Sequence, residues 1–502
     1  MAGGPLPLTD ARPRVDWWAL AAVVAPGAVL VAQAARLSVG PWGDQAAIQL
    51  SVDRALHGGQ LVGPYSRFRW SHPGPIYFYL LAGPYRALGS TPRALLVASV
   101  LLTVVAAGAV VVAAGLLGGT RAARWSAAVV TAELAALGPG IVSQVWNPVA
   151  TIVPTTLFLI CCAGLAAGRW WSLVGVVAAG SFLVQTDVST GLVVAAVALA
   201  ALAVAVVRTR SAFRARPAIV AIAVVVALWL APVWQQATGH PGNLSRLLDF
   251  FRTHTGTGHS LGDAARAVAG ALWPPLRGRL EGAPPGMATS VTVLVCALAL
   301  AAGLVVIGWR WRRPLVGALG GAAGLSVLAG VVSAMRVTGP LFAYLVEWLS
   351  AATAVLVLGV LLLVGYRVAA GTALGVGAIA LGVVGAVQPP RVAPGGAQVD
   401  ALWAAARPEL PGSGSGPIEV ALAGSQDWPW GAGVLVDATH AGYRAVAQRS
   451  WLFLFGTQFT PGPGSRPVVW VWRPGTDRPP SAREVGRAGG MAVSVSLPAP
   501  AP

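Results

Sequence analysis

The chain has 502 residues, of which 56% are hydrophobic and only 10% are charged, and its formal net charge at pH 7 is +17. Many uninterrupted apolar runs reach the roughly 20 residues that a helix needs to cross a bilayer, so the composition excludes a soluble protein and indicates a polytopic membrane protein. All the basic residues are arginines, and they gather largely in short loops between apolar runs. Membrane topology accounts for this charge, which therefore gives no reason to expect a nucleic-acid partner.

About eleven apolar runs are predicted to span the lipid bilayer as helices. The first, residues 17–35, ends with the letters AQA, which resemble a signal-peptidase site. We expect an uncleaved anchor, because the run is long and many others follow. The remaining predicted spans are residues 94–118, 125–140, 149–168, 170–186, 188–207, 217–235, 287–309, 314–335, 341–365 and 368–387. Three cysteines fall inside these runs and are expected to be packing residues.

The arginines predict the orientation in the plasma (inner) membrane. With a cytoplasmic N-terminus, every short loop that carries arginine lies inside, as the positive-inside rule requires. These loops contain Arg121 and Arg124, Arg169, Arg208 to Arg216, Arg310 to Arg313, and Arg367. The same count predicts a transmembrane domain, residues 1–388, with outer-face loops 37–93 and 237–286, and an extracytoplasmic domain, residues 389–502.

Within the first outer loop, residues 76–89 (IYFYLLAGPYRALG) are apolar but too short to span. They predict an amphipathic helix that lies in the outer interface. A twelfth crossing here would reverse all later loops and place the arginine cluster at residues 208–216 outside, against the charge bias.

After residue 388 the sequence takes on the character of a soluble protein. QPPRVAPGG predicts a linker and PELPGSGSGP a flexible loop. PIEVALAG and RPVVWVWRP alternate like strands, while WGAGVLVDATHAGYRAV predicts a short helix followed by a strand. We expect a small α/β domain of about a hundred residues, which is enough for an independent core, and a disordered SLPAPAP end.

The polar stretch GDQAAIQLSVDRALHGG, residues 43–59, predicts a helix with Asp44 at its start, where the amide dipoles favour an anion. Asp44 is either an N-cap, a group that acts on substrate, or both. Asp53 lies nine residues later, about 180° around an ideal helix, so the two carboxylates share no face. Paired acid and base chemistry between them is not expected.

The following stretch, GPYSRFRWSHPGP, adds Tyr65, Arg67, Arg69 and His72. Arginine donates paired hydrogen bonds to phosphate, and aromatic faces suit sugar rings. The alternative is a belt of interfacial anchors, which would account for the aromatic residues alone.

These motifs, in this order, resemble the GT-C superfamily of membrane glycosyltransferases, and in particular the polyprenyl-phosphate-sugar dependent enzymes of actinobacterial cell envelopes. The resemblance consists of a first span followed at once by GDQA, then a basic residue and GG, then HPGP leading into an aromatic amphipathic helix. It implies an all-α polytopic bundle, a polyprenyl-phosphate sugar as donor, a cell-envelope acceptor, and transfer on the outer face.

The resemblance also implies roles for single residues. Asp44 matches the catalytic aspartate, and residues 71–75 (SHPGP) match the family's H-P-P motif with a glycine inserted in place of one proline. Gln45 stands where the family usually has a second acid, which implies a metal-independent single-base variant or an inactive descendant. No cofactor is required by this pattern, and Gln45 becomes a candidate substrate-binding residue.

Further candidates lie in later segments. Arg336 joins Arg67 and Arg69 as a candidate for binding the donor phosphate, or is an ordinary helix-end anchor. Tyr344, Trp146 and Asn147, like Tyr65 and His72, are candidates for contact with substrate; in SQVWNPVAT the alternative is a simple turn. Gln185 and Asp187 rank below Asp44. The three histidines of loop 237–286 match no compact metal-ligand spacing, so a divalent metal is possible but unsupported.

Three functions stay open at this level. The first is a glycosyltransferase that modifies a cell-envelope glycan, lipid or protein, with Asp44 as general base. The second is a transporter or flippase of a lipid-linked sugar, which is expected to show inverted repeats and broken helices that the sequence does not clearly contain. The third is a non-catalytic envelope-assembly subunit, which would keep the topology without depending on Asp44.

Overall fold

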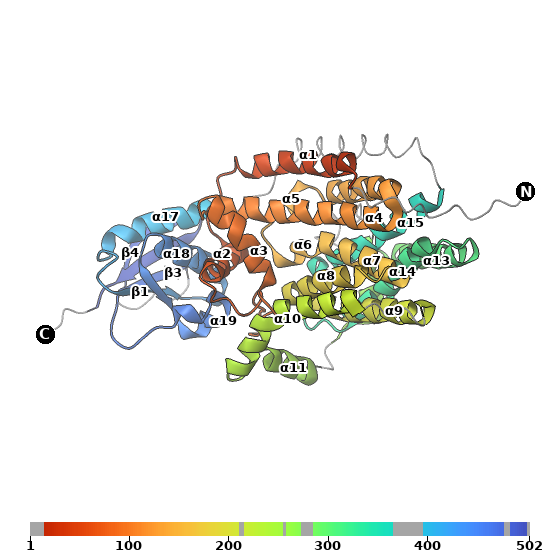
Figure 1. Cartoon of the computed structure of the whole chain (residues 1–502). Coiled ribbons are helices and arrows are strands. Elements are labelled where there is room, and N and C mark those ends of the chain that lie inside the picture. The colour runs from red at the N-terminus through yellow and green to blue at the C-terminus, as the bar shows by residue number, and fades with distance from the viewer. Residues whose placement is uncertain are drawn as a thin grey trace, which may run out of the picture.

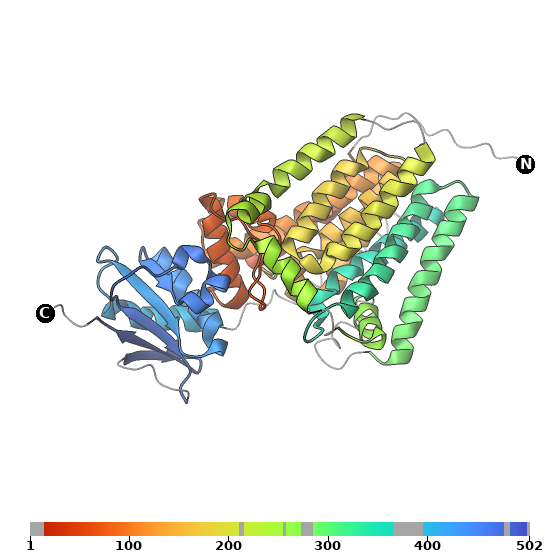
Figure 2. The same cartoon turned by 90° about the horizontal axis from the view of Figure 1, so that it is seen from below.

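The computed structural model describes residues 15–209, 215–254, 258–272, 285–364, 395–475 and 482–498. Long apolar helices lie side by side in one bundle, and a small sheet with its own helices lies at one end of it (Figures 1 and 2). The bundle helices are α1 (Trp17–Ala34), α4 (Pro92–Leu137), α7 (Ile152–Ala166), α8 (Ser172–Thr186), α9 (Gly191–Thr209), α10 (Ala215–Thr238), α13 (Met287–Arg310), α14 (Pro314–Met335) and α15 (Ser350–Val364).

Among the described residues, eight helices are long and apolar enough to cross a membrane, and α8 is a shorter apolar helix. One of the eight, α4, is two arms in sequence, because Gly119 has non-helical backbone angles (φ 73°, ψ −170°). A Cβ added at Gly115 would lie 3.2 Å from the Cβ of Ala123, whereas eight residues of straight helix span about 12 Å. The chain therefore folds back at Gly119, as the two predicted spans 94–118 and 125–140 require.

The predicted span at 368–387 and Arg367 lie outside the described residues, so the total number of spans stays a prediction. The linker QPPRVAPGG and the SLPAPAP end also fall largely outside them.

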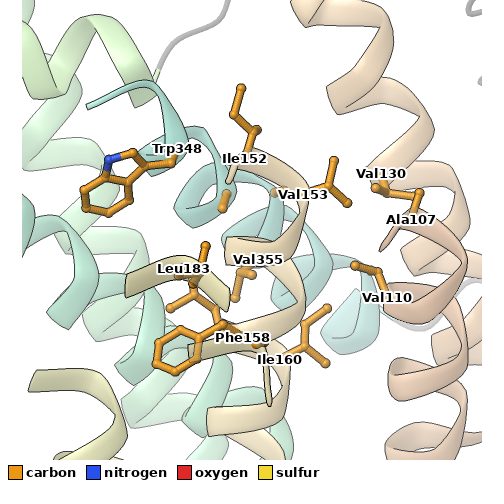
Figure 3. Close-up of a cluster of buried hydrophobic side chains, with 14 of the residues drawn as sticks. Ala107, Val110, Val130, Ile152, Val153, Phe158, Ile160, Leu183, Trp348 and Val355 are labelled. Carbon is orange, nitrogen blue, oxygen red and sulfur yellow. The ribbon is translucent and has the colours of Figure 1, made fainter. Parts of the chain in front are cut away.

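The centre of the bundle is α7, whose side chains pack on every side. Figure 3 shows Ile152, Val153, Phe158 and Ile160 of this helix between residues of α4, α8 and α15. Of the eight candidate spans, the one that contains α7 has the largest buried share, 83%. Its cysteines, Cys161 and Cys162, are buried and unpaired, as expected of packing residues, whereas Cys296 of α13 is exposed and does not fit that prediction.

Shorter helices cover the end of the bundle that carries the sheet: α2 (Gly43–Leu56), α3 (Ile76–Ala87), α5 (Pro139–Val142), α6 (Asn147–Ala150), α11 (Asn243–Thr253) and α12 (Leu261–Leu272). The predicted helix at 76–89 is present as α3. Tyr77 and Tyr85 are fully buried, whereas Tyr79 and Leu80 are exposed, so α3 has the two faces that the sequence predicted. Its position in the membrane interface stays a prediction.

The C-terminal residues form a five-stranded sheet in the order β2-β1-β3-β5-β4. Strands β1 (Pro417–Leu422), β2 (Arg444–Ala447) and β3 (Val468–Trp472) are parallel, while β4 (Arg483–Ala488) and β5 (Met491–Ser496) form an antiparallel hairpin beside β3. Helices α17 (Gly396–Ala406) and α18 (Trp428–His440) pack against it. The predicted strands and helix are confirmed as β1, α18, β2 and β3; the β4–β5 hairpin was not predicted.

Helix α2 connects the two parts, because its two faces belong to two different cores. Ile48, Val52 and Ala55 pack in the core of the bundle, whereas Ala46, Ala47 and Leu50 pack in the core of the sheet. Positions three or four apart share a helix face, so this spacing gives α2 an apolar stripe on each side.

The segment before α2 is also held closely by the C-terminal residues. A Cβ added at Gly40 would lie 2.6 Å from the backbone carbonyl carbon of Gly396. The two backbone segments therefore approach each other as closely as only glycines allow. Trp42 then packs edge-to-face on Trp430 of α18, with ring centroids 5.7 Å apart. The start of α2 is therefore fixed to the sheet before its first turn begins.

Leu50 is 2% exposed, so Leu50→Ala leaves a cavity between α2 and the sheet that costs about 2–5 kcal/mol. We expect the thermal unfolding temperature of the protein in detergent to fall by several degrees. Leu80→Ala on α3, where the side chain is 45% exposed, is the control and should unfold as the unchanged protein does. Equal unfolding temperatures for Leu50→Ala and the control would contradict the shared core.

Candidate functional site

Asp44 lies in the first turn of α2, but it does not cap the helix. The N-cap is Trp42, with no side-chain hydrogen bond, and Gly43 takes a positive φ of 56° where the helix begins. The N-cap interpretation of Asp44 is therefore wrong. The Asp44 carboxylate instead accepts a hydrogen bond from the hydroxyl of Tyr65 at 2.7 Å. Burial raises the pKa of Asp44, and the Tyr65 hydrogen bond opposes that rise.

Tyr65 is presented by a hairpin of residues 63–72. The Ser66 amide donates to the Trp70 carbonyl at 2.8 Å, and the His72 amide donates to the Pro64 carbonyl at 2.8 Å. Arg69 closes the turn with a φ of 65°. This hairpin directs Tyr65 back toward α2, which the letters GPYSRFRW alone did not predict.

Asn243 at the start of α11 fixes the hairpin to the segment that contains α11. Its Oδ1 accepts from the Ser71 amide at 2.8 Å, and its Nδ2 donates to the Ser71 carbonyl at 2.8 Å. Asn243 itself is 6% exposed. The predicted loops 37–93 and 237–286 are thus joined by a paired hydrogen bond beside the site.

His72 is held as a neutral imidazole. The Val188 amide donates to Nδ1 of His72 at 2.9 Å, so the ring proton lies on Nε2. Burial lowers the pKa of His72, and the negative charge of Asp187 opposes this effect. Asp187 is 2% exposed and caps the short helix η1 (Val188–Thr190) by accepting from the Ser189 amide at 2.9 Å. His72 therefore fastens the hairpin to the end of α8.

A cavity of about 840 Å³ opens beside Asp44. Its lining includes eight of the residues predicted for the site: Asp44, Tyr65, Arg67, His72, Trp146, Asn147, Arg336 and Tyr344. The cavity also reaches two membrane-span helices at Leu192 of α9 and Val332 of α14, whose side chains are 43% and 46% exposed. Sequence segments nearly three hundred residues apart thus meet in one apolar space with arginines in its wall.

The two arginines of this large cavity have different environments. Arg67 donates to the Thr338 carbonyl at 3.2 Å, and its guanidinium carbon lies 5.5 Å from the centre of the Phe342 ring. The guanidinium of Arg336 forms no hydrogen bond or ion pair with the described residues. Trp146 packs on Tyr344 with ring centroids 4.6 Å apart, and Tyr344 stacks on Phe342 at 5.4 Å, so an aromatic wall lies beside Arg67.

Asp44 also lines a second cavity, of about 400 Å³. It shares Asp44, Tyr65, Asn147, Phe453 and Leu454 with the large cavity. Its remaining polar lining includes Ser51, Arg54, Gln60, Arg69, Asn243 and Arg246. The Asp44 carboxylate therefore stands where an apolar cavity that reaches the spans meets a polar cavity among the loops.

Two predicted residues lie elsewhere than expected. Arg69 lines the small cavity and not the large one that holds Arg67 and Arg336, because the hairpin turn carries it over the ring of Phe453, 5.8 Å away. Gln45 lines neither cavity: its Nε2 donates to the Pro92 carbonyl at 3.2 Å. Gln45 thus connects α2 to the start of α4, and its assignment as a substrate-binding residue is not supported.

The C-terminal residues supply a wall that the sequence did not predict. Trp428 of α18, Trp451, and Phe453 and Leu454 of α19 (Leu452–Phe455) line the large cavity. The only signal was the run WLFLF, which is unusually aromatic for a soluble domain. Within the described ranges, no group of three or more His, Cys, Asp or Glu side chains could hold a metal ion.

No protein-family model matches this chain, and no curated protein sequence matches it. Among solved structures, it is similar to ArnT from Cupriavidus metallidurans in the apo state, with a TM-score of 0.45, 14% identity, and coverage of 95% of this chain and 98% of that chain. It is also similar to the same protein bound to undecaprenyl phosphate, with a TM-score of 0.44, 14% identity and coverage of 97% and 99%. Similarity at this sequence identity and TM-score does not establish an activity for this chain.

The neutral state of His72 predicts a stability that depends on pH. Because its folded pKa is lowered, His72 favours folding above the ordinary histidine pKa of about 6.5, and this contribution is lost as the pH falls below that value. In His72→Asn, the amide oxygen still accepts from Val188 but does not titrate. The drop in unfolding temperature between pH 7.5 and 5.5 should therefore be smaller in His72→Asn. An equal drop in both proteins would show that His72 is not held neutral.

Proposed function

We propose that this protein is a membrane glycosyltransferase that transfers a sugar from a polyprenyl-phosphate donor to a cell-envelope acceptor, with Asp44 as the general base. The observation that carries the proposal is the position of Asp44, in the wall between a large cavity that reaches the membrane spans and a small cavity among polar loops. A lipid-linked donor and a polar acceptor need this arrangement, because each must reach the same reacting atoms from a different environment.

The large cavity suits the donor. An isoprenoid chain can enter it between α9 and α14, where Leu192 and Val332 face outward. The donor phosphate then meets Arg67 and Arg336, whose guanidinium groups can stabilise the negative charge that grows as the phosphate leaves. Trp146 and Tyr344 supply aromatic faces for the sugar.

The reaction needs one proton acceptor. The bond between the anomeric carbon and the phosphate oxygen breaks, and its electron pair stays on the phosphate. The acceptor hydroxyl oxygen forms the new bond to that carbon, and its proton passes to Asp44. A carboxylate is a better base when its pKa is raised toward the working pH, which is the direction that burial imposes on Asp44.

We further propose that the site faces outward in the plasma membrane, with a cytoplasmic N-terminus and residues 389–502 as the extracytoplasmic domain. The large cavity lies at the first residues of α9 and the last of α14. Arg208 ends α9 and Arg312 precedes α14, so these arginines lie at the opposite end of the bundle. Arg124, which pairs with Asp16 at the start of α1 at 2.8 Å, lies at that end too. The positive-inside rule assigns the arginine-bearing end to the cytoplasm.

A lipid-linked sugar transporter is the second candidate, since the large cavity would also hold its cargo. The small cavity favours the enzyme, because a transporter needs no second polar cavity that shares its carboxylate with the first. A non-catalytic subunit would have no use for a partly buried carboxylate that lines two cavities.

Asp44→Asn keeps the size of the side chain but removes the proton acceptor. We expect the release of polyprenyl phosphate from radiolabelled polyprenyl-phosphate sugars, in the presence of envelope acceptors, to fall by about 10²–10⁴-fold. Asp53→Asn is the matched control on the same helix, because the Asp53 carboxylate contacts His440 at 3.0 Å and lines neither cavity. Undiminished turnover in Asp44→Asn would exclude Asp44 as the base.

Tyr65→Phe removes the hydroxyl that stabilises the Asp44 carboxylate, so the pKa of Asp44 should rise further. A hydrogen bond to a charged group is worth about 1.5–3 kcal/mol, so its loss should be measurable. We expect the acid limb of the kcat/KM profile to move to higher pH. Tyr79→Phe, which loses only a hydrogen bond to the Gln60 carbonyl, should leave the limb in place. A limb that is unmoved in Tyr65→Phe contradicts the coupling.

A further inference from the structure

We infer that the small cavity binds the acceptor, and that this acceptor carries an anionic group, a phosphate or a carboxylate, close to the hydroxyl that receives the sugar. Naming the bound molecule as the acceptor rests on the proposed function. The anion site itself is inferred from the residues that line the cavity. Three arginines, Arg54, Arg69 and Arg246, line this space of about 400 Å³ together with a single acid, Asp44.

The arginines of the small cavity keep their positive charge unpaired among the described residues. None of its three arginines forms an ion pair with a carboxylate within the described parts of the chain. Arg54 donates instead to neutral oxygens, at 3.0 Å to Oε1 of Gln458 and at 3.5 Å to Oγ1 of Thr457. Arg69 lies over the ring of Phe453. These contacts position the guanidinium groups without cancelling their charge.

Partial burial makes the positive charge of Arg54 energetically unfavourable unless an anion lies beside it. The side chain is partly buried, and its pKa is lowered chiefly by that burial. A desolvated cation that faces only neutral groups gains from an anionic partner more than an exposed surface arginine would. The three arginines also come from three separate segments: Arg54 from α2, Arg69 from the hairpin and Arg246 from α11. Their convergence on one cavity is therefore a property of the tertiary fold and not of one basic stretch.

The large cavity is the less suitable place for this acceptor. It reaches the membrane spans, and its own arginines are already matched by the single phosphate of the proposed donor. The small cavity is bounded by α2, by the last turn of α10, by α11, by loop residues and by the C-terminal segment 452–457. Its polar lining, including Ser51 and Gln60, offers hydrogen-bonding groups for sugar hydroxyls.

The test is equilibrium dialysis of the purified full-length protein in detergent, without donor, against three radiolabelled probes: glucose, glucuronate and glucose 6-phosphate. We expect one or both anionic probes to bind about tenfold more tightly than glucose. One additional charge-assisted hydrogen bond is enough to produce a difference in affinity of this size. Tight binding of both probes indicates that charge alone is recognised, and tight binding of glucose 6-phosphate alone indicates a phosphate. Added salt should weaken this preference.

Variants locate the site. Arg246→Gln and Arg54→Gln should each remove most of the preference for the anionic probe, whereas Arg252→Gln, on the same helix as Arg246 but outside both cavities, should retain it. Equal or absent binding of the three probes, or a preference that is lost in Arg336→Gln and kept in Arg246→Gln, overturns the inference. Because the assay needs no turnover, a protein that shows this preference but transfers no sugar refutes the proposed function and leaves the anion site standing.

Discussion

The packing of α2 between two hydrophobic cores is the constraint on which the rest of the site depends. One face of this helix is fixed to the bundle through residues such as Val52, and the other is fixed to the sheet through residues such as Leu50. Asp44 lies at the end of α2 that the close contact of Gly40 with Gly396 holds in place. Any loosening of either core would therefore move the carboxylate relative to both cavities at once.

Electrostatically, the site combines arginines that form no ion pair with the described residues and a carboxylate that is partly shielded from water. The arginines of the large and small cavities lie on either side of Asp44, and Tyr65 supplies a single hydrogen bond to it. His72, although close by, accepts the Val188 amide on Nδ1, which favours its neutral form. The resulting field favours anionic groups on both sides of the carboxylate, which is the distribution that a phosphate leaving group and a charged acceptor require.

Much of this arrangement could be read from the sequence, because apolar runs of sufficient length become helices and their polar ends collect at one side. Arg67, Arg336 and Tyr344 lie together for that reason. The directions of Gln45 and Arg69 could not be predicted, since they depend on the neighbouring start of α4 and on a hairpin turn with positive φ. The aromatic wall of α19 depends on the docking of the sheet, which no local pattern records.

The shared wall between the cavities also bears on biosynthesis. Asp44 leaves the ribosome early, Asn243 emerges roughly halfway, and Phe453 comes near the end of the chain. Synthesis proceeds from the N-terminus, so the hairpin forms its contact with Asn243 only after α11 has been made, and the two cavities have no common boundary until the C-terminal segment has docked. A partly made chain would therefore carry the Asp44 carboxylate in an incomplete setting, and both cavities would be complete only after the whole molecule is in place.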